Sequence, residues 1–567
     1  DGVYGAPRFH KAAQQAGLKA IIGAELTIET TQDSRYKPRS HGVTEKNQKD
    51  LGASRWSLPV LVETQEGYRN LCRLITRMKM RADPPGPPSS RTTRSARWRG
   101  KRDGALTLEE LDGATAGLVA LGGRALLDTR HHGVGGLLDR LVGLFGRRNV
   151  YVELQRHLLR DEEAANAALD ALAQAYGVPV IASNGVRFAE PADRPLFDVL
   201  TCVRHHATLD SAGRFLARNA ERYLKSPESM SQLFADRRDA VANAAALAER
   251  LGYTMADLGY RFPAYPVPAG ETEVSFLRHI TDAGARDRYR PYHDKARAQI
   301  ARELDLIEKL DLAGYFLIVW DIVNYTRQQG ILVQGRGSAA NSAVCYSLGI
   351  TAVDPIAMDL LFERFLSEER GEWPDIDLDL PSGDRRERVI QHVYEKYGRL
   401  GAAMTANVIT YRSRSATREV GKALSLDDDA IDRLAKVMNH FEFTDPNETL
   451  GRNLESVGLS LDMPRMRTFA ELWVRIQDLP RHLGQHSGGM VICQGALDAV
   501  VPLEPATMPG RVVVQWDKDD CAEMGIVKVD LLGLGMMAVL QDAIQLVNSR
   551  QPAVGSRQPE PQHPLST

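Results

Sequence analysis

An alternating acidic and apolar stretch at residues 373–380, WPDIDLDL, constrains the fold more than any other part of the sequence. Pro374 disfavours a helix, and the alternation predicts a short β-strand with its apolar side chains on one face. Asp375, Asp377 and Asp379 then share the other face, about 6.5 Å apart in succession. This spacing suits a hard divalent cation with oxygen ligands, although an acidic edge strand explains such a pattern about as well.

A second strand pattern, at residues 525–533, favours the metal site over the edge strand. Its alternation places Lys528 and Asp530 on one face, so it supplies a further acid and a cation. A third stretch, residues 331–341, reads as a strand that enters a glycine-rich turn and then a helix. Backbone N–H groups at the start of such a helix suit a phosphate, although the stretch lacks the Gly-Lys-Ser/Thr of a Walker A loop.

Taken in order, GRGSAANS, PDIDLDL and VKVDLLGL resemble the C-family DNA polymerases, which are the bacterial DNA polymerase III alpha subunits. The stretches RFPAYPVPAG and RHLGQHSGGMVI resemble the error-prone branch of that family, the ImuC-type translesion polymerases. The resemblance covers nearly all of residues 1–548, which correspond to the first half of such a polymerase. It implies an error-prone, DNA-directed DNA polymerase that acts in translesion synthesis and DNA repair.

The resemblance also implies the site residues and the partners. Asp375, Asp377 and Asp530 would be the catalytic and metal-binding residues, which hold two Mg²⁺ or Mn²⁺ ions for nucleotidyl transfer from a dNTP to a primer 3′-hydroxyl. The triphosphate would be bound by Gly335, Arg336, Gly337, Ser338 and Lys528. The implied partners are primer-template DNA, the sliding clamp and the ImuA and ImuB accessory proteins.

Length and composition set broader bounds. A chain of 567 residues, with 43% hydrophobic and 25% charged residues, predicts about four domains of an ordinary globular protein. No apolar run is long enough for a membrane span, so we expect a cytoplasmic protein. The five cysteines form no metal-binding or disulfide pattern. A formal net charge of −2 means that nucleic-acid binding would depend on local basic patches.

The first 260 residues alternate helix and strand patterns, which predicts a parallel sheet or a barrel. They resemble the PHP domain of C-family polymerases, a distorted β/α barrel, and we expect the chain to begin inside that domain. Glu25 and His157 fall where the resemblance places metal ligands, but Arg187 stands where the family often has histidine. A cation cannot bind a metal ion, so we expect a scaffold, with Glu25 and His157 as remnants.

The expected fold is therefore multidomain, of α/β and α+β class, with a polymerase palm and an inserted helical thumb. The expected order is a PHP domain at 1–260, palm at 261–406, thumb at 407–485, palm at 486–548 and a disordered tail at 549–567. Residues 31–55 and 84–102 are expected to be surface insertions.

The thumb segment carries three basic residues at a spacing of four, Arg414, Arg418 and Lys422. They share one face of the predicted helix, and we expect them to contact the DNA backbone, with a solvated face as the alternative. His482 and His486 are also four apart, but no cysteine or acid at metal-ligand spacing accompanies them, so we expect structural roles for both.

Two other functions remain open at this point. One is a metal-dependent phosphoesterase or exonuclease that uses the PHP domain, and the other is a non-catalytic DNA-binding remnant. Without the fingers that follow in the family, we expect residues 1–567 alone to bind primer-template DNA weakly and to extend it poorly or not at all.

Overall fold

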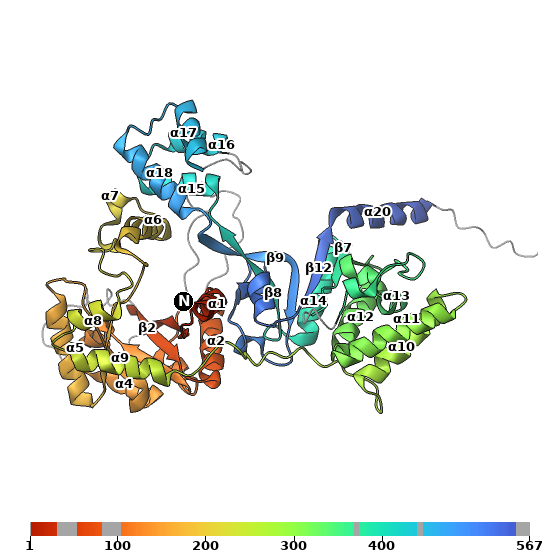
Figure 1. Cartoon of the computed structure of the whole chain (residues 1–567), viewed down its shortest axis with the longest axis horizontal. Coiled ribbons are helices and arrows are strands. Elements are labelled where there is room, and N and C mark those ends of the chain that lie inside the picture. The colour runs from red at the N-terminus through yellow and green to blue at the C-terminus, as the bar shows by residue number, and fades with distance from the viewer. Residues whose placement is uncertain (1, 31–53, 82–103, 368–372, 439–445, 551–567) are drawn as a thin grey trace, which may run out of the picture. The chain divides into compact units, whose positions relative to one another are not determined.

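The computed structural model describes residues 2–30, 54–81, 104–367, 373–438 and 446–550 (Figure 1). The chain divides into two compact units. The first comprises residues 1–259, 406–485 and 498–524, and the second comprises residues 260–405, 486–497 and 525–567. The segment 486–548, expected to be one piece of palm, is thus divided between the units. The expected insertions and the tail lie outside the described residues except for a few residues at their edges.

A five-stranded sheet lies in the first unit, with its strands in the order β1-β2-β3-β4-β5. The strands are β1 Gly23–Thr30, β2 Ser54–Val62, β3 Leu118–Gly122, β4 Val150–Gln155 and β5 Val180–Ser183. The expectation of a parallel sheet was wrong for half of it: β1–β2 and β2–β3 are antiparallel, and only β3–β4 and β4–β5 are parallel. Hydrophobic periodicity predicts that a strand exists but not the direction in which it joins the sheet. The described strands form an open sheet, and the barrel stays a prediction.

Helices accompany this sheet, several of them where the apolar periodicity predicts them. They are α1 Ala6–Gln15, α2 Gln65–Met80, α4 Gly136–Phe145, α5 Glu162–Tyr176, α8 Pro227–Leu233 and α9 Arg238–Arg250. A further helix of this unit, α6 Arg194–His205, packs instead with the helices of residues 413–476. The Thr64 side chain accepts a hydrogen bond from Gly67 N and caps α2. Tyr68, on the buried face of α2, donates a hydrogen bond to Val500 O at 3.1 Å. The segment 498–524 therefore packs with the first unit, where it forms β10 Leu503–Pro505, β11 Val512–Asp517 and α19 Lys518–Glu523.

The expected thumb segment is helical, as predicted. It contains α15 Ser413–Ala423, α16 Asp428–Val437, α17 Pro446–Ser456 and α18 Pro464–Ile476. Their apolar faces share one core, which includes Val420, Leu434 and Phe469. Trp473 is buried in this core and donates its indole N–H to Thr417 Oγ1 at 2.9 Å, so its polar atom is satisfied. The helices hold α15 in a fixed orientation with its polar face exposed.

The second unit combines helices with a mixed sheet. Its helices are α10 Glu273–Arg288, α11 Asp294–Lys309, α12 Ala313–Gln328, α13 Ala343–Ser347, α14 Asp384–Tyr397 and α20 Gly535–Arg550. Its strands are β6 Gln334–Arg336, β7 Asp377–Pro381, β12 Lys528–Leu534, and the parts of β8 Ala402–Thr410 and β9 Pro480–Ile492 that belong to this unit. They lie in the order β8-β9-β12-β7-β6. The pairing of β12 with β7 is parallel, and those of β12 with β9 and of β6 with β7 are antiparallel.

Two expectations from composition can be compared with the structure. All five cysteines are buried and none of them forms a disulfide, as expected for core thiols. In the parts of the chain that the structure describes, no helix combines the length and apolar character needed to cross a membrane.

Candidate metal and nucleotide site

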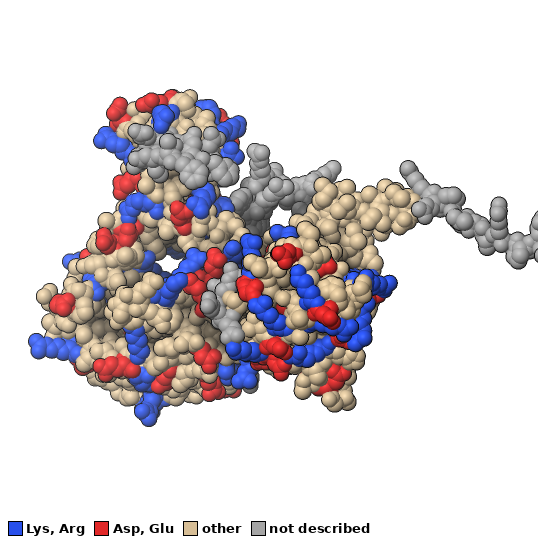
Figure 2. Space-filling view, turned by 45° about the vertical axis from the view of Figure 1, so that its right-hand side comes forward, with Lys and Arg blue, Asp and Glu red and all other residues tan. Residues whose placement is uncertain are grey.

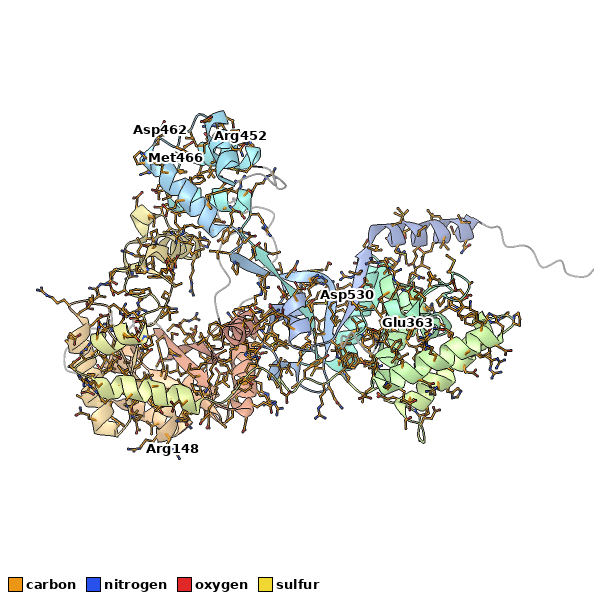
Figure 3. All side chains as sticks on the ribbon, in the orientation of Figure 1. Arg148, Glu363, Arg452, Asp462, Met466 and Asp530 are labelled. Carbon is orange, nitrogen blue, oxygen red and sulfur yellow. The ribbon has the colours of Figure 1, made fainter. Side chains whose placement is uncertain are left out.

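Three carboxylates converge on paired strands in the second unit. The parallel register of β12 and β7 sets Asp530 directly opposite Asp377, although the two strands lie far apart in the sequence. Asp375 immediately precedes β7, and ligand oxygens of Asp375, Asp377 and Asp530 lie within 4.8 Å of one another. Figure 3 labels Asp530 on β12. The predicted convergence is present in the structure, because residues that face each other across parallel strands are brought within contact distance.

Lys528 lies between two of these acids. Its Nζ donates hydrogen bonds to Asp375 Oδ1 at 2.8 Å and to Asp530 Oδ2 at 2.7 Å. Burial would lower the pKa of Lys528, but the hydrogen bonds and charges of Asp375 and Asp530 outweigh it and raise the pKa. Lys528 therefore stays cationic and serves as the counter-charge of the acidic group, on the face that the alternation predicts.

One oxygen of the group has a different environment. Asp530 Oδ1 is buried and has no hydrogen-bond partner among the described residues. A buried carboxylate oxygen without a donor is costly, and a divalent cation would satisfy it. With three carboxylates that supply hard oxygen ligands, the residues present fit a divalent cation.

The pKa of Asp377 gives this site a pH dependence. Burial, followed by the charges of Asp375 and Asp530, raises that pKa to about 6. A protonated carboxyl binds metal poorly, so Mn²⁺ affinity should fall about tenfold between about pH 7 and about pH 5. Isothermal titration calorimetry at both pH values checks this. Since folding raises this pKa above its ordinary value of 3.8, the metal-free protein should also lose stability as the pH rises from about 4 to about 6. A metal affinity that does not change over this range would contradict the assignment of Asp377.

Asp379 and Arg336 form a pair beside the acids. Arg336 Nε lies 3.0 Å from Asp379, and its Nη2 lies 3.4 Å from Asp377. The antiparallel pairing of β6 with β7 causes this, since Arg336 lies directly opposite Asp377 and two residues from the partner of Asp379. The ligand group therefore contains Asp375 and Asp377 but not Asp379, and Arg336 is held at its edge.

The glycine-rich segment differs in detail from the expectation. Only Gln334–Arg336 form a strand, and Gly337–Asn341 form a short 3₁₀-helix rather than an α-helix. Gly337 adopts a φ of +74°, which favours glycine. The Gly335 N–H donates to Ile350 O at 2.6 Å and is therefore not available to a phosphate. Gly337 is exposed and Ser338 is half-buried, so these two remain candidates for phosphate contact.

Glu303 stabilises this segment, a role that was not predicted from the sequence. It is fully buried on α11 and accepts hydrogen bonds from Ser342 Oγ at 2.8 Å and from Ala343 N and Val344 N, each at 3.0 Å. It therefore caps the start of α13. The signal was a charged residue on the apolar stripe of a predicted helix, three residues after the buried Ile300.

The sequence did not show which acidic residue lies nearest to His486. Its Nδ1 accepts hydrogen bonds from Gly488 N at 3.2 Å and Gly489 N at 2.7 Å and lies 4.0 Å from Asp530 Oδ1. The bonds to backbone agree with the structural role expected for His486, while the pairing of β9 with β12 places it beside the acids. Local sequence spacing could not show this neighbour.

The candidate DNA-contacting residues lie in the first unit, on α15. Arg414, Arg418 and Lys422 are all exposed, while Ala416 and Val420 on the opposite face are buried. The shared exposed face is confirmed. Arg418 forms an ion pair with Asp432 at 2.5 Å, so part of its charge is already balanced. Over the surface seen in Figure 2, basic and acidic side chains alternate, in line with the small net charge.

The predicted PHP remnants are engaged in contacts within the protein. Glu25 lies 3.2 Å from Arg187. His157 Nδ1 lies 2.7 Å from Glu162 Oε1, and its Nε2 lies 3.0 Å from Asn184 O, so both ring nitrogens face acceptors. Across the described residues, the group of Asp375, Asp377 and Asp530 is the only one in which three or more such side chains could hold a metal. Both ring nitrogens of His157 are thus engaged within the protein, and the absence of a phosphoesterase centre stays a prediction.

Comparison with known proteins identifies two regions. Residues 1–157 match the family model of the PHP domain, and residues 275–533 match that of the bacterial DNA polymerase III alpha NTPase domain. The second match contains all three converging acids.

Several curated relatives bear the name error-prone DNA polymerase. That of Anaeromyxobacter dehalogenans (strain 2CP-C) is 39% identical over 634 aligned residues, which cover 98% of this chain and 52% of the relative. That of Mycolicibacterium paratuberculosis is 42% identical over 551 residues, which cover 96% and 47%. The chain spans about half the length of these relatives. The chain therefore combines a PHP domain at residues 1–157 with a region at residues 275–533 that is similar to the bacterial DNA polymerase III alpha NTPase domain.

Proposed function

We propose that this chain is part of an error-prone DNA-directed DNA polymerase that acts in translesion synthesis and DNA repair. The observation that carries the proposal is the convergence of Asp375, Asp377 and Asp530 on two paired strands, within the region that matches the polymerase III alpha family. The names of the relatives support the error-prone branch.

In this proposal the three carboxylates hold Mg²⁺ or Mn²⁺, which would stabilise the charge that develops during nucleotidyl transfer. Lys528 and Arg336, which already lie beside the acids, would neutralise the phosphates of the incoming dNTP. Gly337 and Ser338 would position the triphosphate, whereas the Gly335 N–H is already bonded to Ile350 O. The substrate-positioning role of these residues is distinct from the metal-binding role of the acids.

The division of the chain follows from the same proposal. Residues 261–406 and 486–548 would act as palm, residues 407–485 as thumb, and residues 1–260 as a PHP scaffold. Primer-template DNA is the proposed partner. The sliding clamp, the ImuA and ImuB proteins and a cytoplasmic location stay predictions.

Primer extension with all four dNTPs and Mg²⁺ or Mn²⁺ tests the function. We expect at most weak extension by the 567-residue chain alone, and any such extension should disappear in the Asp375→Ala/Asp377→Ala double variant. The double variant also controls for a contaminating polymerase. Extension that persists in the double variant would refute the assignment of the acids, and a lack of all template-dependent incorporation would favour a non-catalytic DNA-binding role.

The role of α15 gives a separate prediction. If Arg414, Arg418 and Lys422 contact three phosphates, the logarithm of the DNA affinity should fall with that of the salt concentration with a slope near about −3. Arg418→Gln should make this slope about 0.9 units shallower, because one phosphate contact is lost. Fluorescence anisotropy at several salt concentrations measures it.

The matched control is Arg467→Gln, which changes an exposed arginine on another helix of the same segment. It should leave the slope unchanged. Equal slopes for wild type and Arg418→Gln would show that this face of α15 is only solvated.

A further inference from the structure

Trp373 places a large aromatic side chain beside the acidic group of the second unit. It is 42% exposed, whereas the other tryptophans that the structure describes are half-buried or buried. Exposure alone is not a sign of function, because isolated apolar side chains are common on protein surfaces. The position of Trp373 is more informative, because it lies two residues before Asp375, one of the converging acids.

The alternation of burial places this indole on the same face as the acids. Pro374 and Ile376 are buried. Trp373 and Asp375, which alternate with them, are exposed, and Asp377 is half-buried. This is the pattern of an extended chain, in which residues two apart share a face and lie about 6.5 Å apart. The indole therefore leaves the chain next to the carboxylates that would hold the divalent cation.

Two aromatic rings hold the indole in place. The ring centroid of Trp373 lies 5.9 Å from that of Phe262 and 6.2 Å from that of Tyr315, distances at which aromatic pairs attract each other. Tyr315 on α12 is buried, and its hydroxyl oxygen accepts a hydrogen bond from Ile376 N at 3.2 Å. The indole is thus supported by protein rings over part of its surface and exposed over the rest. A ring held in this way loses little conformational entropy when a ligand stacks on it.

The charges near Trp373 indicate the kind of ligand that the exposed indole would meet. The acidic group fits a divalent cation, and Lys528 and Arg336 lie beside it, an arrangement that suits phosphates bound together with the cation. A nucleotide bound through its phosphates carries its base away from the cation, and the base presents flat apolar faces. Aromatic side chains bind nucleobases by stacking, because every base has a π face.

We propose that Trp373 is a nucleotide-binding residue, which stacks on the base of a nucleotide bound at the acidic group. This role rests on the proposed function, because it takes the acids as the nucleotide site. The base belongs either to the incoming dNTP or to the 3′-terminal nucleotide of the primer, and both offer the same stacking face. Since stacking does not depend on the hydrogen-bonding edge of the base, Trp373 contributes to the affinity for all four bases and not to the choice between them.

Calorimetric titration of the 567-residue chain with dATP and Mg²⁺, without DNA, tests this role. We expect saturable binding with a Kd below about 1 mM, and Trp373→Ala should weaken it about tenfold because the stacking face is lost. Inorganic tripolyphosphate has the phosphates but no base, so Trp373→Ala should change its affinity by less than about twofold. Trp373→Phe keeps an aromatic face and should bind dATP within about threefold of wild type.

Tryptophan fluorescence gives a second measurement. A base stacked on Trp373 should quench its emission when dATP is added, and Trp373→Phe should remove most of this quenching. The matched control is Trp320→Phe, because Trp320 lies on α12 in the same unit but packs against Tyr265 and Phe276. It should keep both the quenching and the affinity for dATP. If Trp373→Ala does not fold, as judged by circular dichroism, the fluorescence of Trp373→Phe still decides the question.

A purely structural role of Trp373 predicts a different set of results. Trp373→Ala would then be less stable to heat, but its affinities for dATP and for tripolyphosphate would change by the same factor. The comparison of the two ligands therefore separates stacking on a base from support of the aromatic cluster.

A primer-template with 2-aminopurine at the primer 3′ end distinguishes the two sources of the base. A selective loss of dATP affinity in Trp373→Ala identifies the incoming nucleotide, whereas a change in 2-aminopurine emission with unchanged dATP affinity identifies the primer terminus. If Trp373→Ala weakens dATP no more than tripolyphosphate and leaves the 2-aminopurine emission unchanged, Trp373 does not stack on a base, and the proposed function stands. If the wild type binds neither dATP nor tripolyphosphate up to about 10 mM, the nucleotide site itself is refuted, and the role of Trp373 with it.

Discussion

Replacement of Asp377 by asparagine is expected to weaken Mg²⁺ and Mn²⁺ binding by at least about 100-fold and to lower nucleotide incorporation by at least about 1000-fold. The amide keeps the shape of the side chain but removes one of three anionic ligands from a group whose oxygens lie within 4.8 Å of one another. Calorimetric titration with Mn²⁺ measures the first effect on the chain itself, and single-turnover primer extension measures the second.

Asp542→Asn is a suitable control, because Asp542 is an exposed carboxylate that pairs with Arg385 on the surface of the same unit. It should change neither quantity by more than about twofold. If Asp377→Asn binds Mn²⁺ as tightly as wild type, the three acids do not form the metal site.

Replacement of Glu303 by alanine is expected to lower the free energy of unfolding of the second unit by about 3 to 5 kcal/mol. The change leaves three buried donors at the start of α13, on Ser342, Ala343 and Val344, without their acceptor. Denaturant unfolding followed by tryptophan fluorescence measures the loss. Nucleotide binding should weaken as well, since the segment from Gly337 to α13 would lose its anchor.

Glu303→Gln should cost less, about 1 to 2 kcal/mol, because one amide oxygen can still accept part of the network. The control Glu308→Ala removes an exposed carboxylate of the same helix that pairs with Arg278, and it should stay within about 0.5 kcal/mol of wild type. A Glu303→Ala protein as stable as this control would show that the buried network contributes little.

The acidic site could be predicted from sequence because its information is local. Alternation at residues 376–380 and 528–532 determines which side chains share a face, and Lys528 and Asp530 do so as expected. The pairing of these two strands, however, was supplied by the resemblance to a family. Nothing in either strand alone specifies a partner so distant in the sequence.

Properties that depend on register or on distant partners were not predictable in this way. The antiparallel direction of β2 against β3, the pairing of Arg336 with Asp379 and the proximity of His486 to Asp530 all arise from strand neighbours. Each depends on the direction or register of strand pairing, which hydrophobic periodicity does not determine. The placement of residues 498–524 in the first unit could not be predicted either, because it depends on a contact with α2, which lies far away in the sequence.

The separation of β7 from β12 has a consequence during synthesis of the protein. A bacterial ribosome adds about 5 to 20 residues per second, so Asp375 and Asp377 emerge roughly 8 to 30 s before Lys528 and Asp530. In that interval the nascent chain holds closely spaced carboxylates without the lysine that later neutralises them. Of the two strands that flank β7 in the sheet, only β6 has already been made, and it brings Arg336 against Asp377 and Asp379. Arg336 is thus the first counter-ion that the acidic strand meets, and Lys528 completes the neutralisation once translation reaches β12.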